Sequence, residues 1–435
     1  MTNRPLKKLS LQTIGCRLNQ YETERIARDL VPLGFRRAQR DEVADLYVIN
    51  TCTVTHRADS DARNLIRRAA RANPSGRVVV TGCYVNADAE LLAAIAGVDA
   101  VIPNEEKHNI VDILSEKFPE LFAVEPDHGC GDTIEEFYHH NRAWIKISDG
   151  CNQRCSYCII PHVRGPLRNR PAAEIIDEIN HLVTNGYREV VLTGVNIGHY
   201  KYRCADSHVK NLAALCRMIM SETDLYRLRI SSIEPQTVRD EMIDVFAASN
   251  GRICRHFHIP LQSGSEHILR QMRRPYGPES YIDRVKKVKA AVPGTIVGGD
   301  VIVGFPGETE EHFNQTRQLV SSGLMDYVHV FSYSDRPGMA AAELPDKINP
   351  EIIRKRRQTL AGVSHQLRQA AFRRQVGQTL EVISECKAES NGYYWAVSDN
   401  YMRVRLPAQA DTGKEVVRVK VTKAFDDHVE GELLD

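Results

Sequence analysis

Short apolar runs alternate with longer amphipathic stretches over the first hundred residues. The runs LSLQTIG (9–15), ADLYVINTC (44–52) and VVVTGC (78–83) have the length and composition of strands. Stretches with helical periodicity, such as 58–74 and 87–97, lie between or after them. Strands that alternate with helices predict a parallel sheet covered by helices. We therefore predict an N-terminal α/β domain over residues 1–122.

A second alternation follows a polar, acidic segment, 123–141, which has the composition of a linker. Six apolar runs then occur: AWIKIS (143–148), EVVLTG (189–194), RLRISS (227–232), HFHIPLQ (256–262), VGGDVIVGF (297–305) and DYVHVFSYS (326–334). Six β/α units predict a (β/α)6 partial barrel, an open relative of the TIM barrel, over residues 142–371. In such a barrel the chemistry lies at the carboxyl ends of the strands.

The last part of the chain combines a basic helix with a run of short strands. Residues 350–375 are helical in pattern and rich in arginine, which is typical of a solvated helix face. The runs 379–389, 393–407 and 415–425 alternate apolar and polar residues and are separated by turn residues. They predict a small antiparallel β-barrel of the OB type over residues 372–435, a shape that often binds nucleic acid. The fold class is thus α/β with a C-terminal β-barrel.

Composition limits the classes of function. The 57 Lys and Arg residues nearly balance the 56 Asp and Glu residues, so any basic surface for a polyanion must be local. The N-terminus has no apolar core of a signal peptide and no later stretch is long and uncharged enough to span a membrane. We expect a soluble, cytoplasmic protein with no membrane partner. Eleven cysteines, an odd number, favour reduced thiols, metal ligation or catalysis over a disulfide framework.

Three cysteines are spaced C-x3-C-x2-C in DGCNQRCSYCIIP (149–161), directly after the first strand of the predicted barrel. A cubane 4Fe–4S cluster takes one thiolate on each iron, so Cys151, Cys155 and Cys158 would leave one iron open for a ligand. The alternative is a structural zinc site completed by His162. Zinc knuckles usually form small free-standing modules, whereas this loop opens a barrel of catalytic type.

Three further cysteines, Cys16, Cys52 and Cys83, each follow an apolar run of the N-terminal domain. Ligand sites of open α/β sheets gather beyond the carboxyl ends of the strands, so these thiols can converge in space. The alternative is that each is a small buried core residue. The remaining cysteines have no ligand spacing.

The C-x3-C-x2-C loop, with Tyr157 just before its last cysteine, resembles the signature of radical S-adenosylmethionine (SAM) enzymes. Other segments extend the likeness: GCRLNQYETE (15–24), VINTCTVT (48–55), VVVTGC (78–83), CSYCIIPHVRG (155–165), HIPLQSGS (258–265) and VGFPGETEE (303–311). With them the chain is similar from end to end to the radical SAM methylthiotransferases. Within this family, CRLNQYETE, LTGVNIGHY, RLRISSIEP and CRHFHIPLQSGS most resemble the branch that acts on threonylcarbamoyladenosine in tRNA.

The resemblance implies a two-cluster enzyme. Cys151, Cys155 and Cys158 match the ligands of the cluster that binds SAM, and Cys16, Cys52 and Cys83 match those of an auxiliary 4Fe–4S cluster that carries the sulfur. One SAM supplies the methyl group and a second supplies the radical. The implied reaction is methylthiolation of N6-threonylcarbamoyladenosine beside the anticodon of tRNA, at carbon 2 of the adenine. Its implied partners are tRNA, an electron donor such as flavodoxin or ferredoxin, and a sulfur source.

The resemblance also suggests weaker site residues. Residues near SAM are Tyr157, Gly194, Asn196, Ser232, Glu234 and Gln262. Three arginines, Arg164, Arg168 and Arg170, are expected to grip phosphate or a carboxylate of the target, because guanidinium forks suit both. The family usually has Ser where Asn169 stands. GFPGETEE lacks the P-loop lysine and is expected to be a strand end continued by a capped helix.

The C-terminal barrel resembles the TRAM domain, which binds RNA in this family. Its NGYYW and DNYMRVR segments interleave aromatic and basic residues, as a base-stacking surface would.

Two alternatives remain within the family: methylthiolation of isopentenyladenosine in tRNA, or of an aspartate on a ribosomal protein. A threonylcarbamoyl target carries a carboxylate and calls for a cation, whereas an isopentenyl group calls for an apolar pocket. An alternative of another class is a non-catalytic RNA-binding protein whose six cysteines hold structural metal. It predicts a colourless zinc protein that is indifferent to oxygen and SAM.

Overall fold

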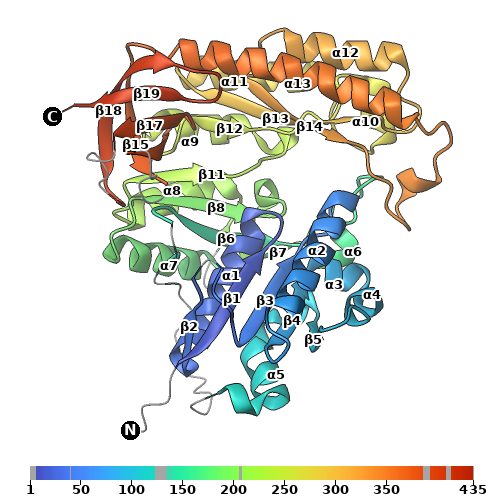
Figure 1. Ribbon diagram of the computed structural model, residues 1–435. Coiled ribbons are helices and arrows are strands. Elements are labelled where there is room, and N and C mark those ends of the chain that lie inside the picture. Colours follow the sequence, from blue (N-terminus) through green and yellow to red (C-terminus); the bar gives the residue numbers. More distant parts are fainter. Residues whose placement is uncertain are drawn as a thin grey trace. The chain divides into compact units, whose positions relative to one another are not determined.

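The computed structural model describes residues 6–39, 41–122, 134, 136–138, 140–204, 208–385, 392–407 and 413–434. The chain divides into two units (Figure 1). The N-terminal unit comprises Met1–Glu135, Asp149–Gln153 and Cys158–Arg168, and the C-terminal unit comprises Glu136–Ser148, Arg154–Tyr157 and Asn169–Asp435. No helix in these described ranges is long and apolar enough to cross a membrane.

The N-terminal unit is built on a five-stranded sheet in the order β2-β1-β3-β4-β5, and each pair of neighbours is parallel. The strands are β1 (Lys7–Thr13), β2 (Phe35–Arg37), β3 (Leu46–Thr51), β4 (Arg77–Gly82) and β5 (Ala100–Ile102). The three long strands are those that the apolar runs predict. The two short edge strands lie in segments whose apolar runs are too brief to single out.

Helices cover both faces of this sheet. They are α1 (Arg17–Leu30), α2 (His56–Ala72), α3 (Cys83–Ala87), α4 (Ala89–Ala93) and α5 (Ile110–Lys117). Side chains alternate along β3, so Val48 packs in the core cluster that contains residues of α1 and α5, while Ile49 packs with residues of α2. This is the α/β arrangement that the sequence predicts.

The C-terminal unit contains the six parallel strands predicted for the barrel. They are β6 (Ala143–Asp149), β8 (Glu189–Gly194), β11 (Arg227–Ile230), β12 (His256–His258), β13 (Ile296–Val303) and β14 (Tyr327–Ser332). The order β11-β8-β6 forms one sheet and β12-β13-β14 another, and isolated parallel bridges such as Ser232 to His258 connect the two. An open, parallel (β/α)6 barrel is thereby confirmed.

Helices link these strands. They are α6 (Ile160–Arg164), α7 (Ala172–Thr184), α8 (Leu212–Glu222), α9 (Asp240–Ala248), α10 (Glu266–Gln271), α11 (Pro278–Ala291) and α12 (Glu310–Ser321). Short strands β7 (Arg168–Asn169), β9 (Tyr202–Arg203) and β10 (His208–Val209) also occur. The Thr309 hydroxyl accepts the His312 N–H at the start of α12, so the capped helix expected after GFPG is present.

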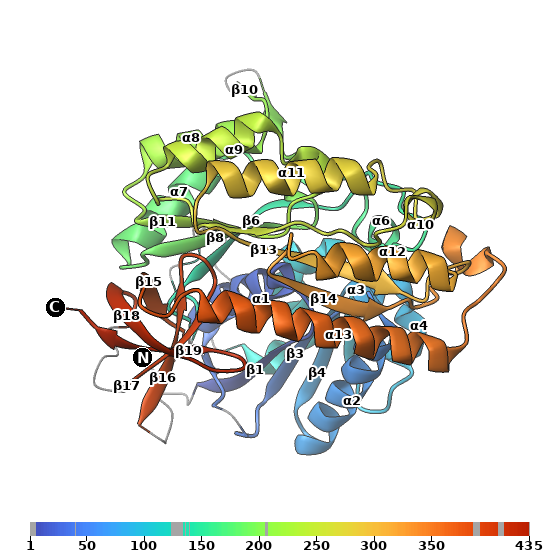
Figure 2. The ribbon, with the colours of Figure 1, turned by 90° about the horizontal axis from the view of Figure 1, so that it is seen from above.

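The basic segment forms one long helix, α13 (Pro350–Arg373), which lies along β14 and α12 (Figure 2). The Ser364 hydroxyl donates to the Val328 carbonyl at 2.7 Å and fixes the helix to β14. Arg356 is buried and donates to the Glu308 carboxylate at 2.8 Å. Part of the positive charge of this helix is therefore structural.

The end of the chain forms a closed barrel in the order β15-β16-β17-β19-β18. Its strands are β15 (Thr379–Ser384), β16 (Tyr393–Ser398), β17 (Arg403–Pro407), β18 (Val416–Ala424) and β19 (Val429–Leu433). The run 393–407 divides into the hairpin β16–β17, because Tyr401 adopts a left-handed φ of 67° in the turn. The predicted small barrel is confirmed, with two more strands than the apolar runs indicate.

Candidate functional site

The three cysteines of the N-terminal unit follow three neighbouring strands. Cys16 follows β1 and is the N-cap of α1, Cys52 follows β3, and Cys83 follows β4 as the first residue of α3. Because β1, β3 and β4 are adjacent and parallel, all three thiols lie at the same edge of the sheet. This is the convergence that the positions of the apolar runs predict.

Two glycines bring the cysteine loops together. Gly15, with φ +111°, approaches Cys52 so closely that an added Cβ would lie 2.6 Å from the Cys52 Cβ. Gly82, with φ +105°, leaves room for only a hydrogen against the Thr51 carbonyl, since an added Cβ would lie 2.3 Å from that oxygen. The residues that precede Cys16 and Cys83 thus both pack against the segment that leads into Cys52.

The three thiols also influence one another electrostatically. Burial raises the pKa of the Cys52 thiol to about 11, and the neighbouring Cys83 and Cys16 add to this rise. Burial likewise raises the pKa of Cys83, against the attraction of Arg164 and Lys107. Cys52 and Cys83 are buried and Cys16 is exposed. Thiols become ligands when a metal centre replaces their protons.

Three thiols match the number of irons of a 4Fe–4S cubane that would need a protein ligand if one iron stays open. In the described residues of the N-terminal unit, no three His, Cys, Asp or Glu side chains are arranged to share one ion. A 4Fe–4S cluster instead takes each thiolate on a different iron, so its ligands remain apart. Three thiols without a fourth ligand would leave one iron open.

A buried arginine contacts the sulfur of Cys83. Arg164 lies in α6, six residues after Cys158, and its Nε donates to the Cys83 Sγ at 3.0 Å. Its Nη1 donates to Glu22 at 2.9 Å and to Asp149 at 3.0 Å. Burial disfavours this charge, but Glu22, Cys83 and Asp149 outweigh it and hold the pKa of Arg164 well above its usual value. The group is therefore a permanent cation beside Cys83.

A buried lysine extends the same network. The Lys107 Nζ donates to Glu22 at 2.6 Å and to Asn50 at 2.9 Å. Burial lowers the pKa of Lys107, and the attraction of Glu22 opposes this change. Sequence reasoning missed Glu22 and Lys107. Neither residue carries a local sequence signal, because Lys107 lies 85 residues from Glu22 and Arg164 lies 142 residues from it.

The structure gives Arg164 a different environment from the one expected of a substrate-binding residue. Its side chain is buried, and its donors are engaged by Cys83, Glu22, Asp149 and Asn19. Arg170 donates to the Lys146 carbonyl at 2.9 Å and to the buried Glu178 at 2.7 Å. Arg168 alone of the three predicted arginines has an exposed side chain, 56% accessible.

The C-x3-C-x2-C loop is divided between the units. Cys151 and Cys158 fall in the N-terminal unit, and Cys155 falls in the C-terminal unit. Gly150 has φ +69°, and an added Cβ would lie 2.1 Å from the Pro166 carbonyl oxygen. The Cys151 N–H donates to the Gly165 carbonyl at 3.1 Å, which closes this loop on itself. His162, the zinc ligand of the alternative interpretation, is exposed on α6.

Cys155 also receives a hydrogen bond from a buried arginine. Arg274 Nη1 donates to the Cys155 Sγ at 3.2 Å, and Arg274 forms an ion pair with Glu234. Burial raises the pKa of Glu234, and Arg274 opposes this rise. Glu234, expected near SAM, is thus already paired with a cation that sequence reasoning did not find.

Two orphaned polar atoms lie at the carboxyl ends of the barrel strands. Gln262 has a left-handed φ of 65°, and its Oε1 is buried without a hydrogen-bond partner in the described structure. The Ser148 Oγ, at the end of β6, is likewise buried and unpartnered there. Gly194 closes against it, since an added Cβ would lie 2.4 Å from that oxygen. A strained residue and unsatisfied acceptors at one strand edge fit a polar ligand such as SAM.

The other residues expected near SAM take varied positions. Tyr157 packs partly buried against a cluster that includes Met272 and Phe305. Asn196 is buried after β8, and its Oδ1 lies 2.9 Å from the His199 Nδ1. Ser232 is exposed beside its bridge to His258.

The C-terminal barrel carries a ladder of aromatic and cationic side chains on β16, β17 and the β18–β19 turn. The Arg403 guanidinium lies 3.6 Å from the Trp395 ring centre, and that of Arg405 lies 4.6 Å from the Tyr393 ring centre. Lys423 lies 4.7 Å from the Phe425 ring centre. This interleaved surface is the one that the sequence predicts for base stacking.

Comparison with known proteins identifies the family. The chain matches the Radical SAM superfamily over residues 145–320 and the Uncharacterized protein family UPF0004 over residues 8–103. It is 37% identical to the Threonylcarbamoyladenosine tRNA methylthiotransferase MtaB of Bacillus subtilis, over 98% of this chain and 96% of that one. It is 31% identical to the tRNA-2-methylthio-N(6)-dimethylallyladenosine synthase of Pelotomaculum thermopropionicum, over 98% of each chain.

Among solved structures, the radical S-adenosylmethionine methyltransferase TsrM of Kitasatospora setae shares the fold. The TM-score is 0.56 at 15% sequence identity, and the match covers 78% of this chain and 77% of that one. The chain belongs to the radical SAM tRNA methylthiotransferases. SAM and 4Fe–4S clusters are the cofactors of this enzyme class.

Proposed function

We propose that this protein methylthiolates N6-threonylcarbamoyladenosine beside the anticodon of tRNA, at carbon 2 of the adenine. The observation that carries the proposal is the similarity to proteins named MtaB, at 37% identity over 98% of the chain for the Bacillus subtilis relative and 36% over 86% and 91% for those of Chlamydia pneumoniae and Rickettsia prowazekii. The segments LTGVNIGHY, RLRISSIEP and CRHFHIPLQSGS support the same branch.

Two cysteine triplets would hold the clusters: Cys151, Cys155 and Cys158 for the SAM cluster, and Cys16, Cys52 and Cys83 for the auxiliary cluster. When bound, the clusters supply the electron that cleaves SAM and the sulfur that is inserted. The protein keeps one iron of each open by providing three thiolates. Arg164 and Arg274 add a hydrogen bond to one sulfur of each triplet.

The residues at the strand ends would orient SAM. Gln262 and Ser148 offer buried unpartnered oxygens to its polar groups, and Gly194 allows a close approach of the backbone. The other residues that we assign to SAM binding are Asn196, Ser232, Glu234 and Tyr157. Arg168, which is exposed, is the arginine of its segment that suits a substrate carboxylate or phosphate.

The aromatic and cationic ladder of the C-terminal barrel supports tRNA as the substrate. A base stacked on such a side chain contributes about 1–3 kcal/mol, so a few stacked bases hold a splayed anticodon loop. The reaction further requires a low-potential electron donor such as flavodoxin or ferredoxin and a source of sulfur, and we place the enzyme in the cytoplasm, where tRNA is found.

Isopentenyladenosine in tRNA is the second candidate. It is favoured by the 32% identity to the tRNA-2-methylthio-N(6)-dimethylallyladenosine synthase of Bacillus cereus, which covers 99% of this chain.

The experiment that separates the two candidates uses anaerobically reconstituted protein, SAM and a reductant. It is offered two tRNA pools, one with threonylcarbamoyladenosine and one with isopentenyladenosine, and nuclease digests are analysed by mass spectrometry. We expect the methylthio product only in the first pool. A product only in the second pool would establish the alternative substrate. SAM cleavage without a product in either pool would refute tRNA methylthiolation.

A further inference from the structure

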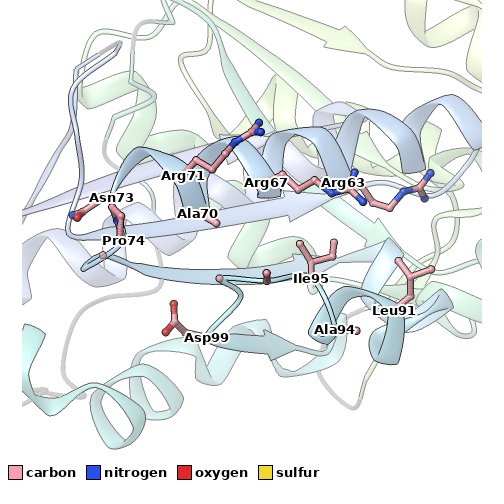
Figure 3. Close-up of a pocket in the computed structure, with 13 residues that line it drawn as sticks. Arg63, Arg67, Ala70, Arg71, Asn73, Pro74, Leu91, Ala94, Ile95 and Asp99 are labelled. Carbon is pink, nitrogen blue, oxygen red and sulfur yellow. The ribbon is translucent and has the colours of Figure 1, made fainter.

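A groove of about 880 Å³ runs along the outer face of α2 in the N-terminal unit (Figure 3). One wall is cationic and consists of Arg63, Arg67 and Arg71 on α2. The facing wall is apolar and comes from α4 and the turn after it, with Leu91, Ala94 and Ile95. Neither wall contains Cys16, Cys52 or Cys83, which lie at the carboxyl ends of β1, β3 and β4.

The cationic wall is a regular line of charge. Its arginines are four residues apart, so they follow one side of the helix at intervals of about 6 Å. No acidic residue occurs from 62 to 87 in the sequence. Asp99, the acidic residue of the lining, already accepts the Val78 N–H at 2.7 Å and pairs with Arg77 at 3.2 Å.

The arginines that face the groove differ from other arginines of the same helix. Arg57 pairs with Asp61 at 3.8 Å, and Arg68 pairs with Asp41 at 3.4 Å. Arg67 and Arg71 are exposed and have no hydrogen-bond or ion-pair partner within the described part of the chain. The unpaired charge on α2 is thus concentrated on the side that lines the groove.

The first arginine of this series, Arg63, contacts the residue that follows Cys83. Arg63 donates to the Tyr84 hydroxyl and lies 6.0 Å from the centre of that ring. Tyr84 directly follows Cys83. The arginine line therefore extends along α2 from the neighbourhood of a proposed cluster ligand.

We propose that this groove binds the sugar–phosphate backbone of the RNA substrate. A linear series of unpaired guanidinium groups matches a polymer with one negative charge on each unit, and the arginine fork suits phosphate oxygens. Leu91 of the apolar wall is 40% exposed, so its side chain can pack against carbon atoms of the ribose and the bases. Such contacts position RNA without reading its sequence. The inference rests on the proposed function, because it takes tRNA as the substrate.

The test measures the affinity for substrate tRNA over a series of salt concentrations. The variant replaces both free arginines, Arg67→Gln with Arg71→Gln, and the matched control replaces both paired arginines of the same helix, Arg57→Gln with Arg68→Gln. Each lost phosphate contact reduces the slope of log affinity against log salt by about 0.7–0.9, so we expect a decrease of about 1.5 for the first pair. The control pair is expected to keep the wild-type slope.

The outcomes separate this inference from the proposed function. If the wild type binds and methylthiolates tRNA but the Arg67/Arg71 variant keeps its slope, or if the control pair loses as much, the inference is wrong and the function stands. If the wild type neither binds nor modifies tRNA, the proposed function fails with it. Iron content and SAM cleavage without tRNA, unchanged in both variants, show intact folding.

Discussion

Two buried arginines each donate a hydrogen bond to the sulfur of a cysteine that we assign as a cluster ligand. Arg164 contacts Cys83 and pairs with Glu22, and Arg274 contacts Cys155 and pairs with Glu234. Hydrogen bonds to ligand sulfurs and nearby charge are among the factors that set the potential of an iron–sulfur cluster. A donor and a positive charge beside the sulfur stabilise the reduced, more negative state.

The substitution Arg164→Lys is expected to lower the reduction potential of the auxiliary cluster. Lysine keeps the charge, but its single ammonium nitrogen replaces two separate donor atoms, Nε toward Cys83 and Nη1 toward Glu22 and Asp149. The measurement is a potentiometric titration followed by electron paramagnetic resonance, with iron content as the check on folding.

Arg63→Gln is the control for that titration, since Arg63 contacts Tyr84, the neighbour of Cys83, and has no hydrogen bond to sulfur within the described part of the chain. An unchanged potential in the Arg164→Lys variant would contradict a role for this hydrogen bond. Arg164→Gln would serve less well, because it leaves Glu22 and Asp149 buried without this cation, at a cost of about 3–5 kcal/mol.

At the scale of elements, strand β11 connects the (β/α)6 barrel to the C-terminal barrel. Arg227 and Arg229 are fully buried and share the carboxylate of Glu189 on β8. Their remaining N–H groups donate to backbone carbonyls of the C-terminal barrel, at Glu381, Val397, Ser398 and Asp399. The Glu189 carboxylate thus orients two arginines of the (β/α)6 barrel so that they can donate hydrogen bonds to the C-terminal barrel.

Replacing that carboxylate, Glu189→Gln, is expected to lower the free energy of unfolding of the C-terminal unit by about 3–5 kcal/mol, because it removes the anion from buried cations. Glu415→Gln is the matched control: Glu415 pairs with exposed Arg188 and its loss is expected to cost at most about 1 kcal/mol. Both tryptophans, Trp144 and Trp395, lie in the C-terminal unit, so tryptophan fluorescence during urea unfolding reports on that unit alone. Equal losses in the two variants would refute the account.

The same carboxylate gives this unit a predictable pH dependence. Burial alone would raise the pKa of Glu189, but Arg227, Arg229 and Arg142 outweigh it and hold the pKa well below its usual value. A depressed folded pKa stabilises the protein above the unfolded pKa, and that contribution is lost as the pH falls. The stability difference between wild type and Glu189→Gln is therefore expected to be full above about pH 5 and to shrink at lower pH. A difference that grew in acid would contradict this sign.

At the scale of the whole molecule, the C-terminal barrel is part of a larger unit rather than a separately tethered module. Its core cluster includes Ile296 and Tyr327 of the (β/α)6 barrel and Phe372 of α13. The aromatic and cationic ladder is therefore fixed relative to the strands that carry Gln262 and Ser148, which all belong to one unit.

The sequence indicated much of this architecture because its signals are local. Apolar runs located the strands, and the strand ends located the cysteines. The contact of Arg164 with Cys83 joins residues 81 positions apart, and no local pattern contains it. The groove beside the arginines of α2 also could not be predicted from the sequence, because its facing wall comes from residues 91–99. Strand β19 was not predicted, because VEGEL is short and two of its five residues are charged.

The central claim is that two cysteine triplets hold two clusters, and metal counting tests it most directly. Iron, sulfide and zinc are measured per chain after anaerobic reconstitution, for the wild type and for the variant with Cys16, Cys52 and Cys83 all changed to alanine. The account predicts about eight irons in the wild type and about four in the variant, with no stoichiometric zinc. Zinc in the wild type, or a variant that keeps all of its iron, would contradict it.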